Sequence, residues 1–128
     1  MGWKVYTAAF TAPNIKNIMK SRKRKMYFGI RGISLRDAYA KLIYKFNNSC
    51  DGYRWELNFL YVDEDLQGRG YSKKLLDKAI AWARKNKIPE IWFVDVNKSF
   101  WRHIRKTYPH IKKKSFMGDT SYFGIIYL

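Results

Sequence analysis

The amino-acid sequence predicts a mixed α/β fold that contains at least one parallel pair of strands. Short runs rich in aromatic and β-branched residues, separated by clusters of turn-forming residues, are typical of strands. One long segment, residues 72–87, instead repeats its apolar residues at helical spacing. This helix stands between two apolar strands, and such a strand–helix–strand connection normally joins parallel strands of one sheet.

The first half of the chain is expected to contribute four strands and one short helix. Residues 3–10 predict a first strand, after which Thr11 or Asn14 is placed to cap a short helix. A three-strand meander follows, with strands over residues 26–30, 38–46 and 53–62. A helix over residues 35–46 also fits the pattern, so both interpretations of that segment remain open.

The second half alternates helices and strands. The helix over residues 72–87 has one apolar face, which is formed by Leu75, Leu76, Ala79, Ile80 and Ala83. Residues 90–96 form a nearly continuous apolar strand, which suits a central, buried position. A second helix over residues 98–106 ends before Pro109, because the residue that precedes a proline avoids helical angles. Two final strands are expected over residues 111–117 and 122–128.

The composition is that of a folded intracellular chain. Hydrophobic residues make up 47% of the 128 residues and aromatic residues 18%, which favours one folded domain spanning residues 1–128. No apolar run is long enough to span a bilayer, and the N-terminus lacks a signal-peptide pattern. Cys50 is the only cysteine, so no intrachain disulfide can form and a reducing, cytoplasmic location is expected.

The charge of the chain is strongly positive, with 26 Lys+Arg against 10 Asp+Glu and a formal net charge of +16. Basic residues concentrate in three runs, from Lys20 to Lys25, from Arg102 to Lys106 and from Lys112 to Lys114, with aromatic residues between and beside them. Basic surfaces that carry aromatic side chains are typical of proteins that bind single-stranded nucleic acid. The same lysines also fit a second interpretation, in which they keep the protein soluble and protect sheet edges.

The segment between the strand ending at Val62 and the helix starting near Gly70 has the features of a phosphate-binding loop. Gly68 and Gly70 allow the backbone to approach a ligand closely. The loop leads into a helix N-terminus, where unpaired backbone N–H groups and the helix dipole favour anions. Arg69 and Lys73 add positive charge beside it.

The sequence Gln67-Gly68-Arg69-Gly70-Tyr71-Ser72 resembles the cofactor motif of the GCN5-related N-acetyltransferases, the GNAT superfamily. The apolar strand over residues 57–62, the downstream Leu75-Leu76 and the order of the elements are also similar to the family. Two features depart from it. Ser72 stands where the family has Gly or Ala, and the N-terminal half has one predicted helix where the family often has two.

The resemblance implies a mixed, mostly antiparallel sheet with a splayed central parallel strand pair flanked by helices. It also implies acetyl-CoA, or another acyl-CoA, as the cofactor. The pyrophosphate would lie on backbone amides of Gln67, Gly68, Arg69, Gly70, Tyr71 and Ser72. The pantetheine arm and the thioester carbonyl would follow the backbone of Leu60, Tyr61 and Val62. Asn97 either touches the cofactor arm or caps the following helix, and Ser99 is a rival for the cap.

The reaction implied by the resemblance is transfer of an acetyl group to a primary amine by direct attack in a ternary complex. Glu56, eleven residues before Gln67, matches the general base of the histone acetyltransferase branch. It also fits a solvated strand carboxylate, and Asp95 is the second candidate for the base. No tyrosine stands in register with the general acid that many members use. Tyr108 is the nearest candidate, followed by His103.

The same fold also supports a different function class, a nucleic-acid-directed protein that modifies a base or an aminoacyl group, or binds without catalysis. The length and composition suit a phage-encoded or mobile-element protein. No metal site is expected, because His103 and His110 lack partners at metal-ligand spacing. We expect a monomer or a homodimer, in which the apolar segment 122–128 would pair across subunits.

Overall fold

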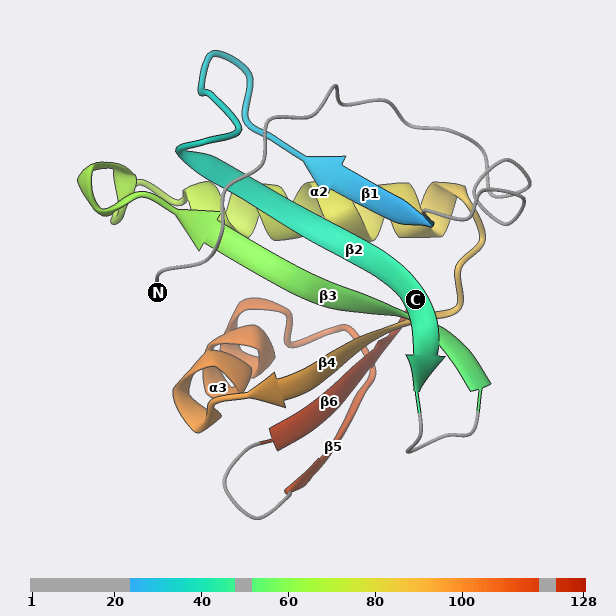
Figure 1. The fold of residues 1–128 in the computed structure, drawn as a ribbon. Coiled ribbons are helices and arrows are strands. Elements are labelled where there is room, and N and C mark those ends of the chain that lie inside the picture. Colours follow the sequence, from blue (N-terminus) through green and yellow to red (C-terminus); the bar gives the residue numbers. More distant parts are fainter. Residues whose placement is uncertain (1–23, 48–51, 118–121) are drawn as a thin grey trace.

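The computed structural model describes residues 24–47, 52–117 and 122–128 (Figure 1). The predicted first strand, the first helix and most of the first basic run lie outside the described residues. The described residues form six strands in one sheet, ordered β1-β2-β3-β4-β6-β5. Their bounds are Lys25–Phe28, Ala38–Asn47, Gly52–Val62, Glu90–Val96, Lys113–Met117 and Tyr122–Tyr127 for β1 to β6.

The sheet is mixed, as the sequence predicts. Strands β3 and β4 run parallel, and the other neighbouring pairs are antiparallel. The parallel pair is joined by the predicted crossover, which contains the short 3-10 helix η1 (Glu64–Leu66) and the long helix α2 (Tyr71–Lys85). Helix α3 (Lys98–Thr107) follows β4. None of the described helices has the length and apolarity needed to cross a membrane.

Strands β3 and β4 splay apart soon after they meet. Within the described residues their register contains one pair, Glu56 with Trp92. Figure 1 shows the two strands converging near one end and diverging toward α3 and η1, so the sheet opens as a V. A β-bulge between Lys41 and Leu42 interrupts the β2–β3 register, and bulges bend and twist strands. The splayed central pair expected from the resemblance is therefore confirmed.

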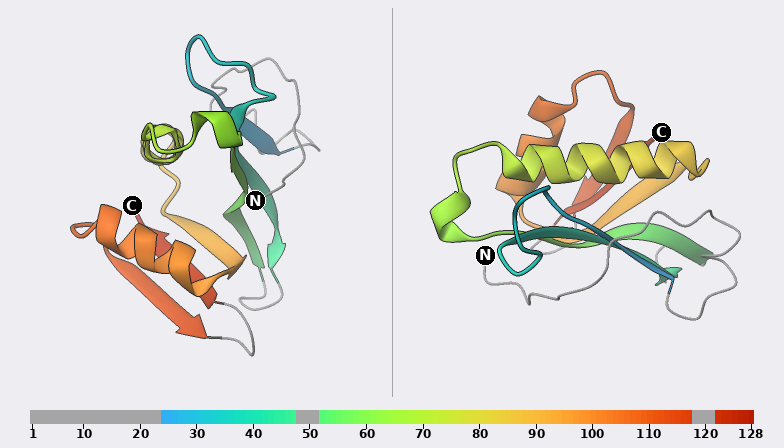
Figure 2. Two further views of the ribbon diagram at one scale, coloured as in Figure 1. Left: turned by 90° about the vertical axis from the view of Figure 1, so that its left-hand side faces the viewer. Right: turned by 90° about the horizontal axis from the view of Figure 1, so that it is seen from above.

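The two helices cover the same face of the sheet, one on each half (Figure 2). Helix α2 lies against β1, β2 and β3, with its predicted apolar face buried. Trp82 of α2 meets Trp55 of β3 edge to face, with ring centroids 5.3 Å apart. On the other half, Trp101 of α3 lies directly over Gly124 of β6, where a Cβ atom would overlap its ring. Two aromatic contacts thus attach the helices to the sheet.

Two sequence-based expectations need correction. Residues 38–46 form a strand within β2, so the helical interpretation of residues 35–46 is wrong. The C-terminal segment was expected to pair across subunits, but β6 is hydrogen-bonded to β4 on one side and to β5 on the other. The expectation fails because the apolar β6 takes the buried interior position, while the basic, exposed β5 forms the edge of the sheet.

Candidate functional site

The loop between β3 and α2 adopts the conformation that its glycines allow. Gly68 and Gly70 have φ values of 81° and 79°, in the left-handed region that other residues avoid. Gly70 is also the N-cap of α2, and within the described part of the chain no side chain caps this helix start. The first-turn N–H groups of α2 are therefore available to a ligand. The first turn contains no acidic residue that would oppose an anion.

Polar contacts near the end of β3 hold this loop in place. The Gln67 side chain donates its Nε2–H to the carbonyl oxygen of Val62 at 3.1 Å. The backbone N–H of Asp63 donates to the carbonyl oxygen of Asp37 at 2.6 Å. The Tyr61 hydroxyl donates to Asp63 Oδ1 at 3.2 Å. The Gln67 side chain thus ties the loop to the backbone at the end of β3, and the Tyr61 hydroxyl holds the Asp63 side chain beside it.

The backbone at the end of β3 alternates between the β2 side and the open side. Because the Asp63 N–H points to β2, the N–H and C=O groups of Val62 point the other way, into the splay. The Gln67 contact with the Val62 carbonyl agrees with this direction. Leu60, two residues earlier, presents its backbone to the same side. The splay thus exposes strand backbone that a regular sheet would use for pairing.

A cleft of about 460 Å³ lies where the splay, the glycine loop and α3 meet. It is lined by Leu60, Val62, Leu66, Gln67, Gly68, Gly70, Tyr71, Ser72, Lys73, Phe100 and His103. Seven of the ten residues predicted to bind the cofactor are among them. The other three, Tyr61, Arg69 and Asn97, do not line the cleft.

Asn97 resolves one alternative that the sequence left open. Its side-chain oxygen accepts a hydrogen bond from the backbone N–H of Phe100 at 2.7 Å, so it caps α3. Ser99, the rival for the cap, instead donates its hydroxyl to the same Asn97 oxygen at 2.9 Å. The geometry therefore gives Asn97 a structural role. The side chain of Asp95, the second candidate for the base, lies outside the described residues.

Glu56 lies at the point where β3 and β4 still pair. Its residue is 5% exposed, so the interpretation as a solvated carboxylate is wrong. Lys45 Nζ lies 3.8 Å from Glu56 Oε1. Because Trp55 packs against α2, the next side chain along the strand points to the opposite face of the sheet. Glu56 is therefore buried at the apex of the splay, on the face away from the helices.

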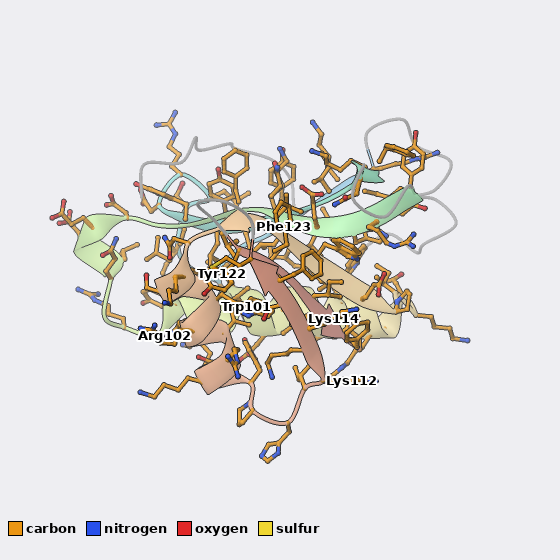
Figure 3. The ribbon with its side chains drawn as sticks, turned by 90° about the horizontal axis from the view of Figure 1, so that it is seen from below. Trp101, Arg102, Lys112, Lys114, Tyr122 and Phe123 are labelled. Atoms are coloured by element: carbon orange, nitrogen blue, oxygen red, sulfur yellow. The ribbon has the colours of Figure 1, made fainter. Side chains whose placement is uncertain are left out.

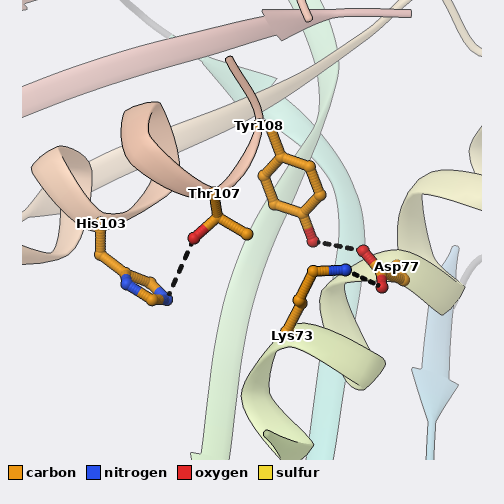
Figure 4. A network of polar contacts seen from close by, with 5 residues as sticks. All are labelled: Lys73, Asp77, His103, Thr107 and Tyr108. Atoms are coloured by element: carbon orange, nitrogen blue, oxygen red, sulfur yellow. Dashed lines mark hydrogen bonds and ion pairs between the residues drawn. The ribbon is translucent and has the colours of Figure 1, made fainter. Parts of the chain in front are cut away.

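Tyr108 takes part in a polar network between α2 and α3 (Figure 4). Its hydroxyl donates to Asp77 Oδ1 at 2.6 Å, and Lys73 Nζ donates to Asp77 Oδ2 at 2.7 Å. Burial and the hydrogen bond to Asp77 raise the pKa of Tyr108 above its ordinary value. For Asp77, burial acts to raise the pKa, but the hydrogen bonds from Lys73 and Tyr108 bring it below its ordinary value. Tyr108 does not line the cleft.

His103 is the cleft-lining histidine of α3. Its ring Nε2 lies 3.5 Å from the Thr107 hydroxyl one turn later (Figure 4). Phe100, one turn earlier, lines the same cleft and packs against Phe93 of β4. Sequence reasoning did not assign Phe100 or Leu66 to the site, although the spacing of Phe100 and His103 on α3 places them on one helix face. In the described part of the chain, no group of three His, Cys, Asp or Glu residues is placed to hold a metal ion.

Several solved structures with a similar fold are described as acetyltransferases. An acetyltransferase from Thermus thermophilus has a TM-score of 0.58 at 15% identity, with 88% of this chain and 70% of that chain covered. A PaiA N-acetyltransferase from Thermoplasma acidophilum, in complex with coenzyme A, has a TM-score of 0.53 at 19% identity, covering 78% and 59%. A GNAT family acetyltransferase from Elizabethkingia anophelis with acetyl-CoA bound has a TM-score of 0.52 at 11% identity, covering 89% and 80%.

Sequence comparison adds the family. No curated protein sequence matches the chain significantly. The family model of the acetyltransferase (GNAT) family matches residues 32–105, which is more than half of the chain. The matched region runs from the turn before β2 into α3 and includes the glycine loop, the splay and Glu56. The chain therefore belongs to the GNAT acetyltransferase family.

Proposed function

We propose that this protein is an acyl-CoA-dependent N-acetyltransferase, which moves an acetyl group from acetyl-CoA to a primary amine. The observation that carries the proposal is the uncapped N-terminus of α2, which opens through Gly68 and Gly70 onto the cleft at the splay. Family membership and the neighbours crystallised with coenzyme A or acetyl-CoA support it. Another acyl-CoA would fit the same arrangement.

The residues of the loop suit the pyrophosphate of the coenzyme. The amides of residues 68–72 would hold its oxygens, since among the described residues no side chain caps the helix start. The Gln67 N–H, which the sequence assigned to the same role, instead donates to the carbonyl oxygen of Glu64 at 3.3 Å. A Cβ atom added at Gly68 or Gly70 would meet no atom within 4 Å, so both glycines leave open space in front of the backbone. Arg69 and Lys73 are exposed beside the loop and add positive charge. The backbone of Leu60, Tyr61 and Val62 would guide the pantetheine arm toward the apex of the splay, with Asn97 capping the helix beside it.

In the proposed reaction, the open side of β3 would bind the thioester, and the face of the sheet away from the helices would supply the general base. Acetyl-CoA supplies an acetyl group activated as a thioester. The Leu60 N–H, which points into the splay like that of Val62 and lies nearer to Glu56 along β3, would donate a hydrogen bond to the thioester carbonyl oxygen as negative charge develops there. Glu56, on the face away from the helices, would accept the proton of the attacking ammonium, directly or through water. The amine thus approaches from the face opposite the coenzyme, as direct attack in a ternary complex requires.

Two side chains compete to protonate the leaving thiolate. The Tyr108 proton is directed at Asp77, and its raised pKa makes it a weaker acid. His103 lines the cleft, and histidine is the side chain that most often transfers protons in enzymes. We therefore favour His103 as the general acid and give Tyr108 a positioning role.

Calorimetric titration with acetyl-CoA tests the coenzyme site. Gly70→Glu places a charged side chain in the cleft and forces a left-handed φ on a residue that avoids it, so binding should be lost. Gly32→Glu is the matched control, because Gly32 also has a left-handed φ of 84° and open space but does not line the cleft. Absence of binding by the unmodified protein at micromolar acetyl-CoA, or equal losses in the two variants, would contradict the proposal.

The transfer itself is tested by following thiol release from acetyl-CoA with a panel of amines. Primary amines should give a product whose mass is increased by one acetyl group. The rate of thiol release should fall when the amine is chemically blocked. If the protein binds acetyl-CoA but releases no thiol with any amine class, the binding function stands and the proposed reaction is wrong.

A further inference from the structure

We propose that the face of β4, β6 and β5 opposite the helices is a docking surface for single-stranded nucleic acid. Gly124 of β6 faces Trp101 of α3, so its neighbours Phe123 and Ile125 face the other way. Phe116 of β5 is the register partner of Phe123, and paired residues share a face. An aromatic surface therefore forms on the side of this half-sheet that the described helices leave uncovered.

The rings on this face are arranged for stacking. Phe116 and Phe123 lie nearly parallel, with centroids 5.9 Å apart and an interplanar angle of 16°. Trp92 of β4 meets Phe116 edge to face at 6.4 Å. Trp92 is buried at 6% exposure, whereas Phe116 is 37% exposed and offers its ring to solvent. Unpaired bases stack on such exposed rings whatever their identity.

Lysines on the same face supply the charge. Lys114 is the register partner of Ile125, so it shares the face of the rings. Lys112 Nζ lies 5.7 Å from the ring centroid of Tyr127, which faces the same way. Figure 3 shows Lys114 on β5, Lys112 just before this strand, and Phe123 on β6. Both lysines are exposed. Two cations beside the exposed Phe116 ring and the half-buried Tyr127 ring match phosphates that flank stacked bases.

The acidic side chains on this face, Glu90 and Glu56, each have a basic partner: Arg54 Nε lies 3.0 Å from Glu90 Oε1, and Lys45 Nζ lies 3.8 Å from Glu56 Oε1. Residues 97–117 hold seven Lys+Arg and no Asp or Glu. One of the seven is used within the fold, because Lys113 Nζ donates to the carbonyl oxygens of Tyr108 and Ile111 at the end of α3. Four of the remaining cations, Arg102 among them, belong to α3, which covers the other face of this half-sheet, so they add to its overall positive field and not to the docking surface (Figure 3). This charge attracts a polyanion to the half of the sheet that carries the rings.

The observations favour a single strand over other occupants. A duplex hides its base faces, so the exposed Phe116 ring would have nothing to stack on. An acidic protein would use the lysines but does not need a planar ring. A second copy of this chain would also carry a net charge of +16, and the repulsion between the two copies disfavours association. Only unpaired bases on a phosphate backbone use both the rings and the lysines.

The surface adjoins the proposed site of transfer. Trp92 is the register partner of Glu56, so the aromatic face begins next to the proposed general base. A bound nucleic-acid strand that carries an amine would lie beside Glu56. This placement of the amine rests on the proposed function, whereas the binding of the nucleic acid is independent of it.

Fluorescence anisotropy with a short labelled oligouridylate, titrated at several salt concentrations, tests the lysines. Lys114→Glu removes one phosphate contact and should reduce the slope of log affinity against log salt by about 0.7, the value for one contact with a single strand. Lys85→Glu is the matched control, because it changes the net charge equally at an exposed position on α2, away from the surface. It should leave the slope unchanged.

The ring is tested separately from the charge. Phe116→Leu keeps an apolar side chain but removes the π face, so affinity should fall by about 5- to 100-fold with an unchanged salt slope. Phe116→Trp restores a ring and should restore affinity. Calorimetry with acetyl-CoA accompanies each variant, so loss of coenzyme binding, which concerns the proposed function, is distinguished from loss of oligonucleotide binding.

Four results would overturn the proposal. The first is no binding of the oligouridylate at low salt, where phosphate contacts are strongest. The second is equal weakening by Lys85→Glu and Lys114→Glu, which would show unspecific attraction to the whole basic protein. The third is unchanged affinity of Phe116→Leu, which would leave a site for any polyanion, including an acidic protein. The fourth is a dimer in sedimentation that Phe116→Leu dissociates, which would make the face a contact between copies.

Discussion

The hydrogen bond between Tyr108 and Asp77 links the end of α3 to the helix that carries the coenzyme loop. Asp77 is shared by two donors, the Tyr108 hydroxyl at 2.6 Å and Lys73 Nζ at 2.7 Å, and Lys73 lines the cleft. Tyr108→Phe keeps the ring and removes one donor. We expect the variant to be less stable and to bind acetyl-CoA more weakly, because Asp77 then fixes Lys73 less well.

The size of the effect follows from the partners and their exposure. A hydrogen bond to a charged group contributes about 1.5–3 kcal/mol to stability. The Asp77 side chain is 43% exposed and keeps Lys73, so water replaces part of the loss. We therefore expect a cost of about 1–1.5 kcal/mol, or about 3–7 °C in the melting temperature of a domain of this size. The affinity for acetyl-CoA should fall by about 2- to 5-fold, the value of one exposed ion pair.

The pH dependence of the difference is a second, independent measure. The pKa of Tyr108 is raised in the folded protein by burial and by the hydrogen bond to Asp77. Its contribution is therefore fully present below about pH 10, the ordinary tyrosine pKa, and is lost as the pH rises toward the folded value. The stability difference between the unmodified protein and Tyr108→Phe should be constant from neutral pH to about pH 9 and shrink above about pH 10.

Urea unfolding followed by tryptophan fluorescence measures these stabilities. A double-mutant cycle with Asp77→Asn should give a coupling energy of about 0.5–1.5 kcal/mol, since the residues are in direct contact. Tyr127→Phe, which removes a hydroxyl from β6, is the control and should change stability by less. Steady-state kinetics should show kcat reduced by less than about 10-fold, because Tyr108 acts through Lys73.

Two outcomes would refute this reasoning. A fall in kcat of about 100-fold or more, with stability and acetyl-CoA affinity unchanged, is the signature of a lost general acid. Tyr108 would then be the proton donor, and its contact with Asp77 would have to open during the reaction. Additive effects of Tyr108→Phe and Asp77→Asn would show that the hydrogen bond does not contribute to stability.

Two further predictions concern the base and the packing of α3. Glu56→Gln should lower kcat by about 10²- to 10⁴-fold and leave the calorimetric affinity for acetyl-CoA unchanged, and an unaltered kcat would exclude Glu56 as the base. Gly124→Ala should cost about 1–3 kcal/mol or more in urea unfolding, because the added methyl group overlaps the Trp101 ring. Gly32→Ala is the control, because its new Cβ meets open space and only the left-handed backbone costs stability, by about 1–2 kcal/mol. The loss of unfolding free energy at Gly32 should not exceed the loss at Gly124.

Local pattern was sufficient for the elements and for the loop. The apolar face of α2, the strand at Glu90–Val96 and the stop before Pro109 follow from spacing and backbone sterics, and the structure confirms them. Gly68 and Gly70 predict left-handed backbone conformations before a helix, and both residues have a positive φ in the structure. Such features depend on residues a few positions apart, so a single sequence carries them.

The position of the last two strands required the whole sheet. The sequence predicts both segments as strands, but their spatial order in the sheet, β4-β6-β5, differs from their order along the chain. The apolar β6 is inserted next to β4, where it is covered by Trp101, and the basic β5 is left at the edge. This placement depends on the competition of two strands for one buried position.

The glycine loop, the crossover helix and the alternation of strands follow from the sequence, because periodicity and glycine sterics are local. Tertiary structure alone decided which face Glu56 occupies, since alternation along β3 has a direction only once Trp55 packs on α2. It also decided that Tyr108 meets Asp77, 31 residues away, and that Phe116 shares a face with Phe123. These contacts join distant parts of the chain, and their geometry exists only after the sheet has formed.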